Sequence, residues 1–181
     1  MQALLRQMVD RGCTAGLMEV SSIGIAMHRA DAIPFKVAIF TNFSRDHLDF
    51  HDSLDDYRSA KAELFHRLLA ADGVAIVNAD DPAHIAMTPA DRRTWTYGLG
   101  AGAQIRGVAL QPSVHGTQFQ IITPSGEYSL FLPLLGQHNV ANALAAFAAA
   151  MAIGITPEQA LEGLQDLSTV PGRLEPVPNE Q

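Results

Sequence analysis

Short apolar runs that end in polar residues recur along the first half of this chain, with helical segments between them. Val37 to Thr41 and Val74 to Asn78 have the length and β-branched content of buried strands, and Ala15 to Val20 and Arg93 to Tyr97 predict two more. Strands that alternate with helices form a mostly parallel sheet flanked by helices. The sequence therefore predicts an α/β fold.

Polar side chains stand where three of these predicted strands end. Glu19, Asn42 and Asn78 occupy such positions, and further polar residues crowd the stretch from Thr41 to His51. In parallel sheets, ligands bind outside the carboxyl ends of the strands. We expect the functional site at this edge.

The pattern changes after about residue 98. Gln104 to Leu110, Thr117 to Thr123 and Tyr128 to Leu132 are separated by turn residues and predict a small antiparallel β unit at about 100–133. Two helices should follow, over Asn139 to Met151 and from Pro157 to about residue 167.

Composition indicates one globular domain. A chain of 181 residues with 48% hydrophobic content can bury a substantial core, and we assign residues 1–169 to a partial domain and 170–181 to a linker toward another domain. Residues 2–11 predict an amphipathic helix. We expect no signal peptide there, because Arg6 interrupts the apolar run that a signal peptide would need. No run is long enough to span a membrane, so we expect a cytoplasmic protein.

Charge and cysteine content exclude several classes of function. The formal net charge of -7 disfavours a nucleic-acid or anionic-membrane surface, and an anionic substrate would need a local basic pocket. The single cysteine, Cys13, rules out an intramolecular disulfide and a cysteine-based zinc site. We expect Cys13 to be a small buried hydrophobe.

A predicted helix after residue 53 carries one lysine on its apolar face. Ser53 is a good N-cap, Asp56 stands where a capping box has its acid, and Lys61 lies one turn from both Tyr57 and Phe65. Either the Lys61 stem packs while its ammonium reaches solvent, or the amine is held at a site. A desolvated, neutral lysine can take up carbon dioxide to give a carbamate. Together with His47 and Glu19, that carboxylate could bind a hard divalent cation such as magnesium.

The remaining histidines and serines suggest less. We expect His51 and five other histidines to be surface or helix-end residues, with His51 the least secure because it lies four residues after His47; the five are His28, His66, His84, His115 and His138. Ser21 and Ser22 lack the Gly-x-Ser-x-Gly turn of a hydrolase, so we reject a hydrolase interpretation.

Six motifs of this chain, taken in order and spacing, resemble the Mur ligases. They are Met18-Glu19-Val20-Ser21-Ser22, Thr41-Asn42-Phe43-Ser44-Arg45-Asp46-His47-Leu48-Asp49, Tyr57-Arg58-Ser59-Ala60-Lys61, Asn78-Ala79-Asp80-Asp81-Pro82, Gly136-Gln137-His138-Asn139-Val140-Ala141-Asn142-Ala143 and Pro171-Gly172-Arg173. Within that family the chain is most similar to the branch that adds the third amino acid of the peptidoglycan stem peptide. The resemblance implies ATP-dependent amide-bond formation through an acyl phosphate, with magnesium offsetting the charge of the transferred phosphoryl group.

The resemblance also implies roles for individual residues on the metal and substrate side. Glu19 and His47 would bind metal, and Lys61 would be a carbamylated lysine at the second magnesium. Ser21 and Arg29 match positions that hold the substrate UDP-N-acetylmuramoyl-dipeptide. Thr41 and Asn42 are assigned to the same side. The alternative for Arg29 is a solvated helix charge.

On the nucleotide side, the resemblance assigns four residues. Asn139 and Asn142 match a pair that reads the adenine edge of ATP; the alternative is a helix cap for Asn139 and a surface position for Asn142. Arg173 matches a residue near the ribose and phosphates. Asp81 either contacts the nucleotide region or forms the turn before Pro82.

Departures from the family pattern limit what this polypeptide can do alone. No Gly-Lys-Thr or Gly-Lys-Ser phosphate loop occurs in it, and Ile23 replaces a histidine that many relatives carry. We therefore expect part of the family's central ATPase domain, inactive in isolation and prone to self-association through an exposed sheet. Two alternatives stay open, namely another ligase of the superfamily such as folylpolyglutamate synthetase, and a non-catalytic remnant that binds nucleotide weakly. The third amino acid, diaminopimelate or lysine, is undecided.

Overall fold

A six-stranded sheet forms the centre of the computed structural model, which describes residues 2–44 and 49–167. Its strands follow one another in chain order. Strands β1 to β4 run parallel to one another, whereas β5 runs antiparallel to β4 and β6 runs antiparallel to β5. This confirms the predicted α/β fold class. The strands are β1 (Phe35–Phe40), β2 (Leu69–Asn78), β3 (Arg93–Gly98), β4 (Ile105–Ser113), β5 (Gly116–Thr123) and β6 (Gly126–Leu132).

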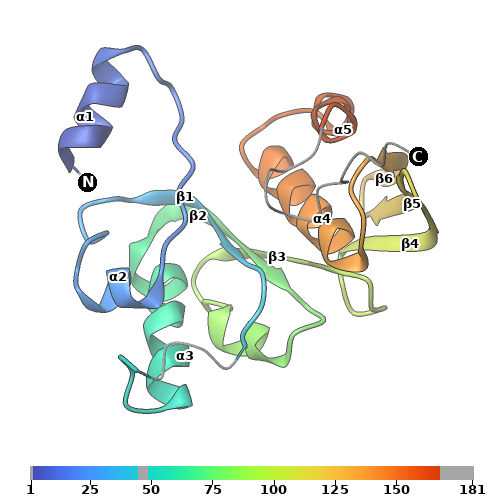
Figure 1. Cartoon of the computed structure of the whole chain (residues 1–181). Coiled ribbons are helices and arrows are strands. Elements are labelled where there is room, and N and C mark those ends of the chain that lie inside the picture. Colours follow the sequence, from blue (N-terminus) through green and yellow to red (C-terminus); the bar gives the residue numbers. More distant parts are fainter. Residues whose placement is uncertain (1, 45–48, 168–181) are drawn as a thin grey trace, which may run out of the picture.

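Helices cover both faces of this sheet. In Figure 1, α4 and α5 lie beside the antiparallel strands, and α3 lies on the other side near β1 and β2. Among the described residues, no helix is long and apolar enough to cross a bilayer. The helices are α1 (Gln2–Asp10), α2 (Ser22–Ala26), α3 (Leu54–Glu63), a π-helical turn (Leu64–Leu68), a 3-10 helix (Pro82–Met87), α4 (Gln137–Ala152) and α5 (Pro157–Gln165).

The alternation of side chains along β2 explains how both faces are filled. Val74 and Ile76 pack into the cluster that contains α4, whereas Ala75 and Val77 pack into a cluster with Phe65 of the π-helical turn. Successive residues of a strand point to opposite faces, so a strand buried on both sides must be apolar throughout. This is why Val74 to Val77 is a continuous apolar run.

The antiparallel strands continue the parallel sheet. β4 pairs with β3 in parallel through Ile105 opposite Tyr97 and Arg106 opposite Gly98, and then turns back into β5. Phe119 and Leu130 of the antiparallel strands are buried in the same cluster as α4. One core therefore extends beneath both parts of the sheet. The division into a domain with an insertion stays a prediction, and residues 170–181 lie outside the described residues.

The prediction of a strand at Ala15 to Val20 is wrong. This segment is irregular and mostly exposed, and among the described residues β1 is hydrogen-bonded to β2 alone. A strand needs a neighbour to accept its backbone hydrogen bonds, and Ala15 to Val20 has none there. Cys13 is also exposed, contrary to expectation. The preceding α1 has the predicted bounds within one residue, buries no side chain and projects from the molecule (Figure 1).

Candidate active site

The register of the parallel strands brings their carboxyl ends to one edge. Phe40 lies opposite Val77 and Asn78 opposite Tyr97, so the loops after β1, β2 and β3 leave the sheet together. The Asn78 amide donates to the carbonyl of Thr41 at 2.7 Å. The predicted grouping of Asn42 and Asn78 at one edge is therefore correct, whereas Glu19 follows no strand.

Asp81 fastens the first of these loops to the second. Its Oδ2 accepts from the backbone N–H of Phe43 at 2.6 Å, and its Oδ1 accepts from that of Ala83 at 2.9 Å. Both carboxylate oxygens thus serve backbone groups, in line with the turn-forming alternative. A contact between Asp81 and nucleotide stays a prediction.

Asp80 joins the loops after β2 and β3 in the same way. Its two carboxylate oxygens accept from the backbone N–H groups of Leu99 at 2.6 Å and Gly100 at 2.9 Å. Nearby, the buried Tyr97 hydroxyl donates to the carbonyl of Phe40 at 3.1 Å. Burial, together with the charges of Asp80 and Asp81, holds the pKa of the Tyr97 phenol well above its usual range. The phenol therefore stays a hydrogen-bond donor.

Lys61 lies where the helical pattern predicted. Ser53 caps α3 by accepting from the Asp56 N–H at 3.0 Å, and Tyr57 and Phe65 of the same face are buried. Lys61 is half-buried, and its ammonium stands 5.1 Å from the centroid of the Tyr57 ring. An aromatic face stabilises a cation at this distance. The helix differs from expectation only in its last part, where Leu64–Leu68 forms a π-helical turn.

His51 is buried, and the expectation that it lies on the surface is wrong. Its side chain is held between Asp56, with Nδ1 at 3.0 Å from Oδ2, and Ser22, with Nε2 at 2.9 Å from Oγ. The Asp56 carboxylate bonds to His51 and not to the Ser53 backbone N–H. Only one half of the predicted capping box is therefore formed, the bond from the Asp56 N–H to the Ser53 hydroxyl. The other five histidines are exposed or half-buried, as expected.

Ser21 and Arg29 flank the short helix α2. The Ser21 hydroxyl accepts from the Gly24 N–H at 3.0 Å and caps the helix, and it remains exposed. The Arg29 side chain is exposed beyond the helix and donates to the sulfur of Met27 at 3.2 Å. Both side chains can be reached by a solute, so their substrate roles stay predictions.

Asn139 and Asn142 come together at the start of α4. The Asn142 amide lies 3.5 Å from Oδ1 of Asn139, whose own amide donates to the carbonyl of Leu135 at 2.8 Å. The cap of this helix is Gly136, so the alternative of Asn139 as a cap is wrong. The helix also begins two residues before the predicted Asn139, because Gly136 adopts a φ of 92° that ends the preceding loop.

The metal site cannot be assembled from the described residues. Glu19 is exposed on the irregular segment, whereas His47 and Arg173 lie outside the described residues. Within residues 2–44 and 49–167, no three His, Cys, Asp or Glu side chains are grouped so that they could hold a metal. The roles of Glu19, His47, Lys61 and Arg173 therefore stay predictions.

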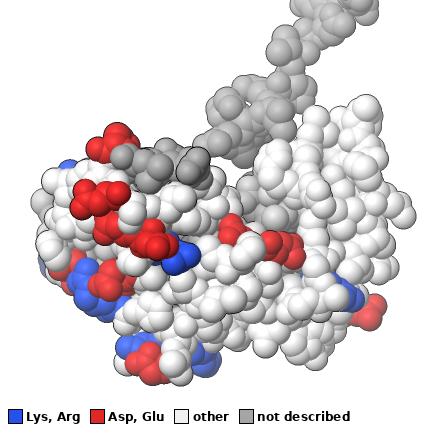
Figure 2. Space-filling model, turned by 90° about the horizontal axis from the view of Figure 1, so that it is seen from below, with Lys and Arg blue, Asp and Glu red and all other residues white. Residues whose placement is uncertain are grey.

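Acidic side chains gather at this end of the molecule. Figure 2 shows the molecule from below the view of Figure 1, with patches of Asp and Glu and fewer basic groups beside them. Segments 49–56 and 80–81, at this edge of the sheet, contain several aspartates. Such a surface attracts cations more readily than free phosphate groups.

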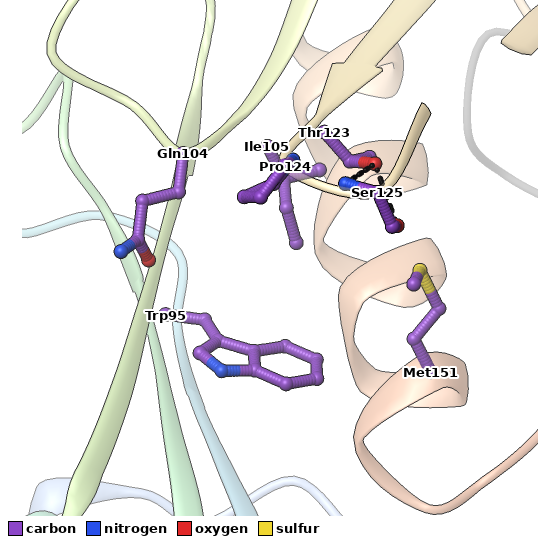
Figure 3. A pocket seen from close by; sticks show the side chains of 7 residues that line it. All are labelled: Trp95, Gln104, Ile105, Thr123, Pro124, Ser125 and Met151. Carbon is purple, nitrogen blue, oxygen red and sulfur yellow. Dashed lines mark hydrogen bonds between the residues drawn. The ribbon is translucent and has the colours of Figure 1, made fainter. Parts of the chain in front are cut away.

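A cavity of about 320 Å³ lies away from all the predicted site residues. Trp95, Ile105 and Met151 give it an apolar wall, and the hydroxyls of Thr123 and Ser125 at its rim are 3.0 Å apart and bond to each other (Figure 3). It lies between β3, the start of β4, the turn after β5 and the last turn of α4, and none of the predicted site residues lines it. The cavity is therefore not part of the candidate active site.

A family model described as the Mur ligase middle domain matches residues 1–150. The chain belongs to the Mur ligase family. Two Mur ligases, both named UDP-N-acetylmuramoyl-L-alanyl-D-glutamate--2,6-diaminopimelate ligase, are similar to it. The one from Thermosynechococcus vestitus is 44% identical over 98% of this chain, and the one from Gloeobacter violaceus is 42% identical over 97%. This chain spans 36% of the length of each.

A solved Mur ligase structure of the same name has the same fold. It superimposes on 99% of this chain with a TM-score of 0.89 and 31% sequence identity, and the match covers 38% of that structure. The resemblance that the six motifs predicted is thereby confirmed at the level of the family.

Proposed function

We propose that this chain is the central part of an ATP-dependent ligase that joins 2,6-diaminopimelate to UDP-N-acetylmuramoyl-L-alanyl-D-glutamate. The observation that carries the proposal is the 44% identity over 98% of the chain to a ligase with that name. The strand ends support it, because Asn78, Asp80 and Asp81 hold three loops at the edge where α/β proteins bind ligands.

Within this proposal, each group of residues has a chemical task. The exposed Ser21 hydroxyl and Arg29 guanidinium suit an anionic UDP-sugar, and Thr41 and Asn42 would line the same side. The reaction activates the substrate carboxylate as an acyl phosphate, and the amine of diaminopimelate then displaces phosphate.

The asparagine pair suits ATP. Each amide carries both a donor and an acceptor, and Asn142 is exposed beside Asn139 at the start of α4. An adenine edge offers the complementary donor and acceptor. Arg173 would contribute at the ribose and phosphates.

Magnesium would neutralise phosphate charge when bound. A carboxylate of Glu19, an imidazole of His47 and a carbamate on Lys61 are ligands that a divalent ion accepts. The described residues do not complete this donor set. Among the described residues, the half-buried Lys61 on the apolar face of α3 is the one that would carry the carbamate.

Steady-state turnover tests the proposal. In the full-length protein, ADP release should require both UDP-N-acetylmuramoyl-L-alanyl-D-glutamate and diaminopimelate, and lysine should not replace diaminopimelate. Lys61→Ala should abolish turnover, whereas Lys36→Ala, which removes an exposed ion pair with Asp72, should leave it unchanged. ATP binding without turnover would instead support the non-catalytic remnant.

A further inference from the structure

A buried chain of hydrogen bonds runs from α3 to the turn that carries Ser21. Asp56 on α3 accepts from His51, and His51 contacts the hydroxyl of Ser22, the first residue of α2. His51 is 4% exposed and Ser22 is 1% exposed. A buried imidazole therefore links a partly exposed carboxylate on α3 to a buried hydroxyl that lies 29 residues away in the sequence.

The partners indicate which nitrogen of a neutral imidazole carries the proton. An ionised carboxylate can only accept, so Nδ1 carries the proton that is donated to Asp56. In the neutral ring Nε2 is then the acceptor, and the Ser22 hydroxyl donates to it. The His51 ring thus has one defined tautomer and one defined orientation.

His51 also contacts the aromatic ring on which Lys61 rests. The centroids of His51 and Tyr57 are 5.3 Å apart, and the Lys61 ammonium is 5.1 Å from the Tyr57 centroid. Phe43, from the loop after β1, also contacts Tyr57, and the centroids of these two rings are 4.9 Å apart. A shift of the His51 ring would therefore be passed to Tyr57 and to Lys61.

The order Asp56, His51, Ser22 resembles a hydrolase triad, but the geometry excludes that chemistry. A nucleophilic hydroxyl must reach the substrate, and the Ser22 hydroxyl is enclosed by protein. The neighbouring Ser21 is the exposed serine, and its hydroxyl is occupied in capping α2. The chain of bonds is suited to holding elements together.

We infer that His51 is a positioning residue that holds the Ser21–Ser22 turn in a fixed relation to Lys61. Through Ser22 it sets the turn that presents Ser21 to the sugar substrate, and through Tyr57 it sets the lysine on α3. The inference rests on the proposed function for the roles of Ser21 and Lys61. The tautomer of His51 and its contacts with Ser22 and Tyr57 do not rest on the proposed function.

Two substitutions of His51 separate its two hydrogen bonds. The amide of His51→Asn lies where Nδ1 lies and can still donate to Asp56, whereas the amide of His51→Gln extends to the position of Nε2 and can still contact Ser22. In the full-length ligase, His51→Asn should lower kcat by about tenfold or more and raise KM for the UDP-sugar, because small misplacements of reacting groups are costly. His51→Gln should retain more of the activity, and KM for ATP should not change in either variant.

Ser22→Ala and His66→Gln complete the design. Ser22→Ala should reproduce the loss seen in His51→Asn, and the double variant should lose little more, since both remove the same contact. His66→Gln alters an exposed histidine, bonded to the Ala86 carbonyl, and should leave both kinetic constants unchanged. Equal losses in His51→Asn and His51→Gln, or losses that multiply in the double variant, would overturn the inference.

Two readouts do not depend on ligase turnover. Nitrogen-15 NMR of histidine-labelled protein should show one ring protonated at Nδ1 and bare at Nε2, and this signal should vanish in His51→Asn. Acylation of Lys61 by an activated ester, followed by peptide mass spectrometry, should become faster in His51→Asn but not in His66→Gln. An Nε2-protonated ring, or an unchanged Lys61 rate, contradicts the inference. If both readouts come out as expected but the wild-type protein does not catalyse ligation, only the proposed function is contradicted.

Discussion

Individual carboxylates fasten the loops of the candidate active site. Asp81 accepts from two backbone N–H groups, those of Phe43 and Ala83, and is half-buried. Asp81→Ala leaves both donors without that partner and should lower the free energy of unfolding by about 1–3 kcal/mol. Urea denaturation measures this. Asp91→Ala, which removes only a surface pair with Arg92, should stay within about 0.5 kcal/mol of wild type, and equal effects would show that Asp81 fastens nothing.

Tyr97 should make the free energy of unfolding fall as pH rises in the alkaline range. Its phenol pKa is raised in the folded protein, chiefly by burial and also by Asp80 and Asp81, so the unfolded chain loses the proton first as pH rises. The stabilisation is complete below about pH 10, the unfolded pKa, and falls by up to about 1.4 kcal/mol per pH unit above it. Tyr97→Phe removes this term.

Denaturation of both forms at neutral and alkaline pH checks this. At neutral pH, Tyr97→Phe should be less stable by about 1 kcal/mol, because the Phe40 carbonyl loses its donor. Above pH 10 the difference between the two forms should narrow. A difference that stays constant with pH would mean that the phenol ionises freely in the folded protein.

At the residue scale, the sequence predicted best where a pattern lies within one element. Lys61 was placed on the apolar face of its helix because Tyr57 and Phe65 recur at helical spacing, and both are buried. His51 was missed because its partner Ser22 is 29 residues away, and no local pattern reports such a contact. The five-residue spacing between His51 and Asp56 was a signal only in retrospect.

At the scale of single elements, the start of α4 depends on one glycine. Gly136 has a φ of 92°, and a Cβ there would lie 2.6 Å from Cε1 of His138. Gly136→Ala should therefore cost about 1–3 kcal/mol and weaken ATP binding, because Asn139 and Asn142 follow in the first turns. Chemical denaturation and calorimetry with ATP measure the two effects.

Gly163→Ala is the matched control within α5. A Cβ there meets no atom within 4 Å, and the position is helical with an ordinary φ. This variant should be slightly stabilised, by about 0.5–1 kcal/mol, and should bind ATP as wild type does. If Gly136→Ala were equally harmless, the glycine would not determine how the helix begins.

The elements that failed to match expectation did so for tertiary reasons. Ala15 to Val20 has a strand-like sequence but no paired strand among the described residues, and hydrogen-bond partners are not encoded locally. β2 begins at Leu69, five residues before the predicted Val74, because Leu69 pairs with Phe35 before the register shifts. Element types were thus read correctly where the apolar pattern was long, and boundaries less well.

At the scale of the whole molecule, the open edge of β1 is the surface at which we expect self-association. Among the described residues β1 is paired on one side only, and an unpaired edge strand can accept another strand. We predict that the 181-residue chain on its own self-associates as its concentration rises, which sedimentation equilibrium measures. A sedimenting mass that stays at the monomer value throughout would refute this.

Proline substitutions identify the edge. Val37→Pro and Ala38→Pro each remove one backbone N–H of β1, and adjacent N–H groups of a strand point to opposite sides. One variant should therefore abolish association and keep its fold, and the other should lose stability through the bond to β2. Association that survives in the folded variant would place the contact elsewhere, for example on the exposed α1.

We expect Lys61 to serve an ATP-dependent ligase as a carbamate. Intact mass spectrometry of the full-length protein in carbon-13 bicarbonate, with Lys61→Ala as the control, tests it most directly. We predict a labile mass increase of one labelled carbon dioxide that is absent from Lys61→Ala, and magnesium and ATP binding by calorimetry that weakens in the same variant. If no adduct is found, and if Lys61→Ala binds magnesium and ATP as tightly as the wild type does, Lys61 does not have this role.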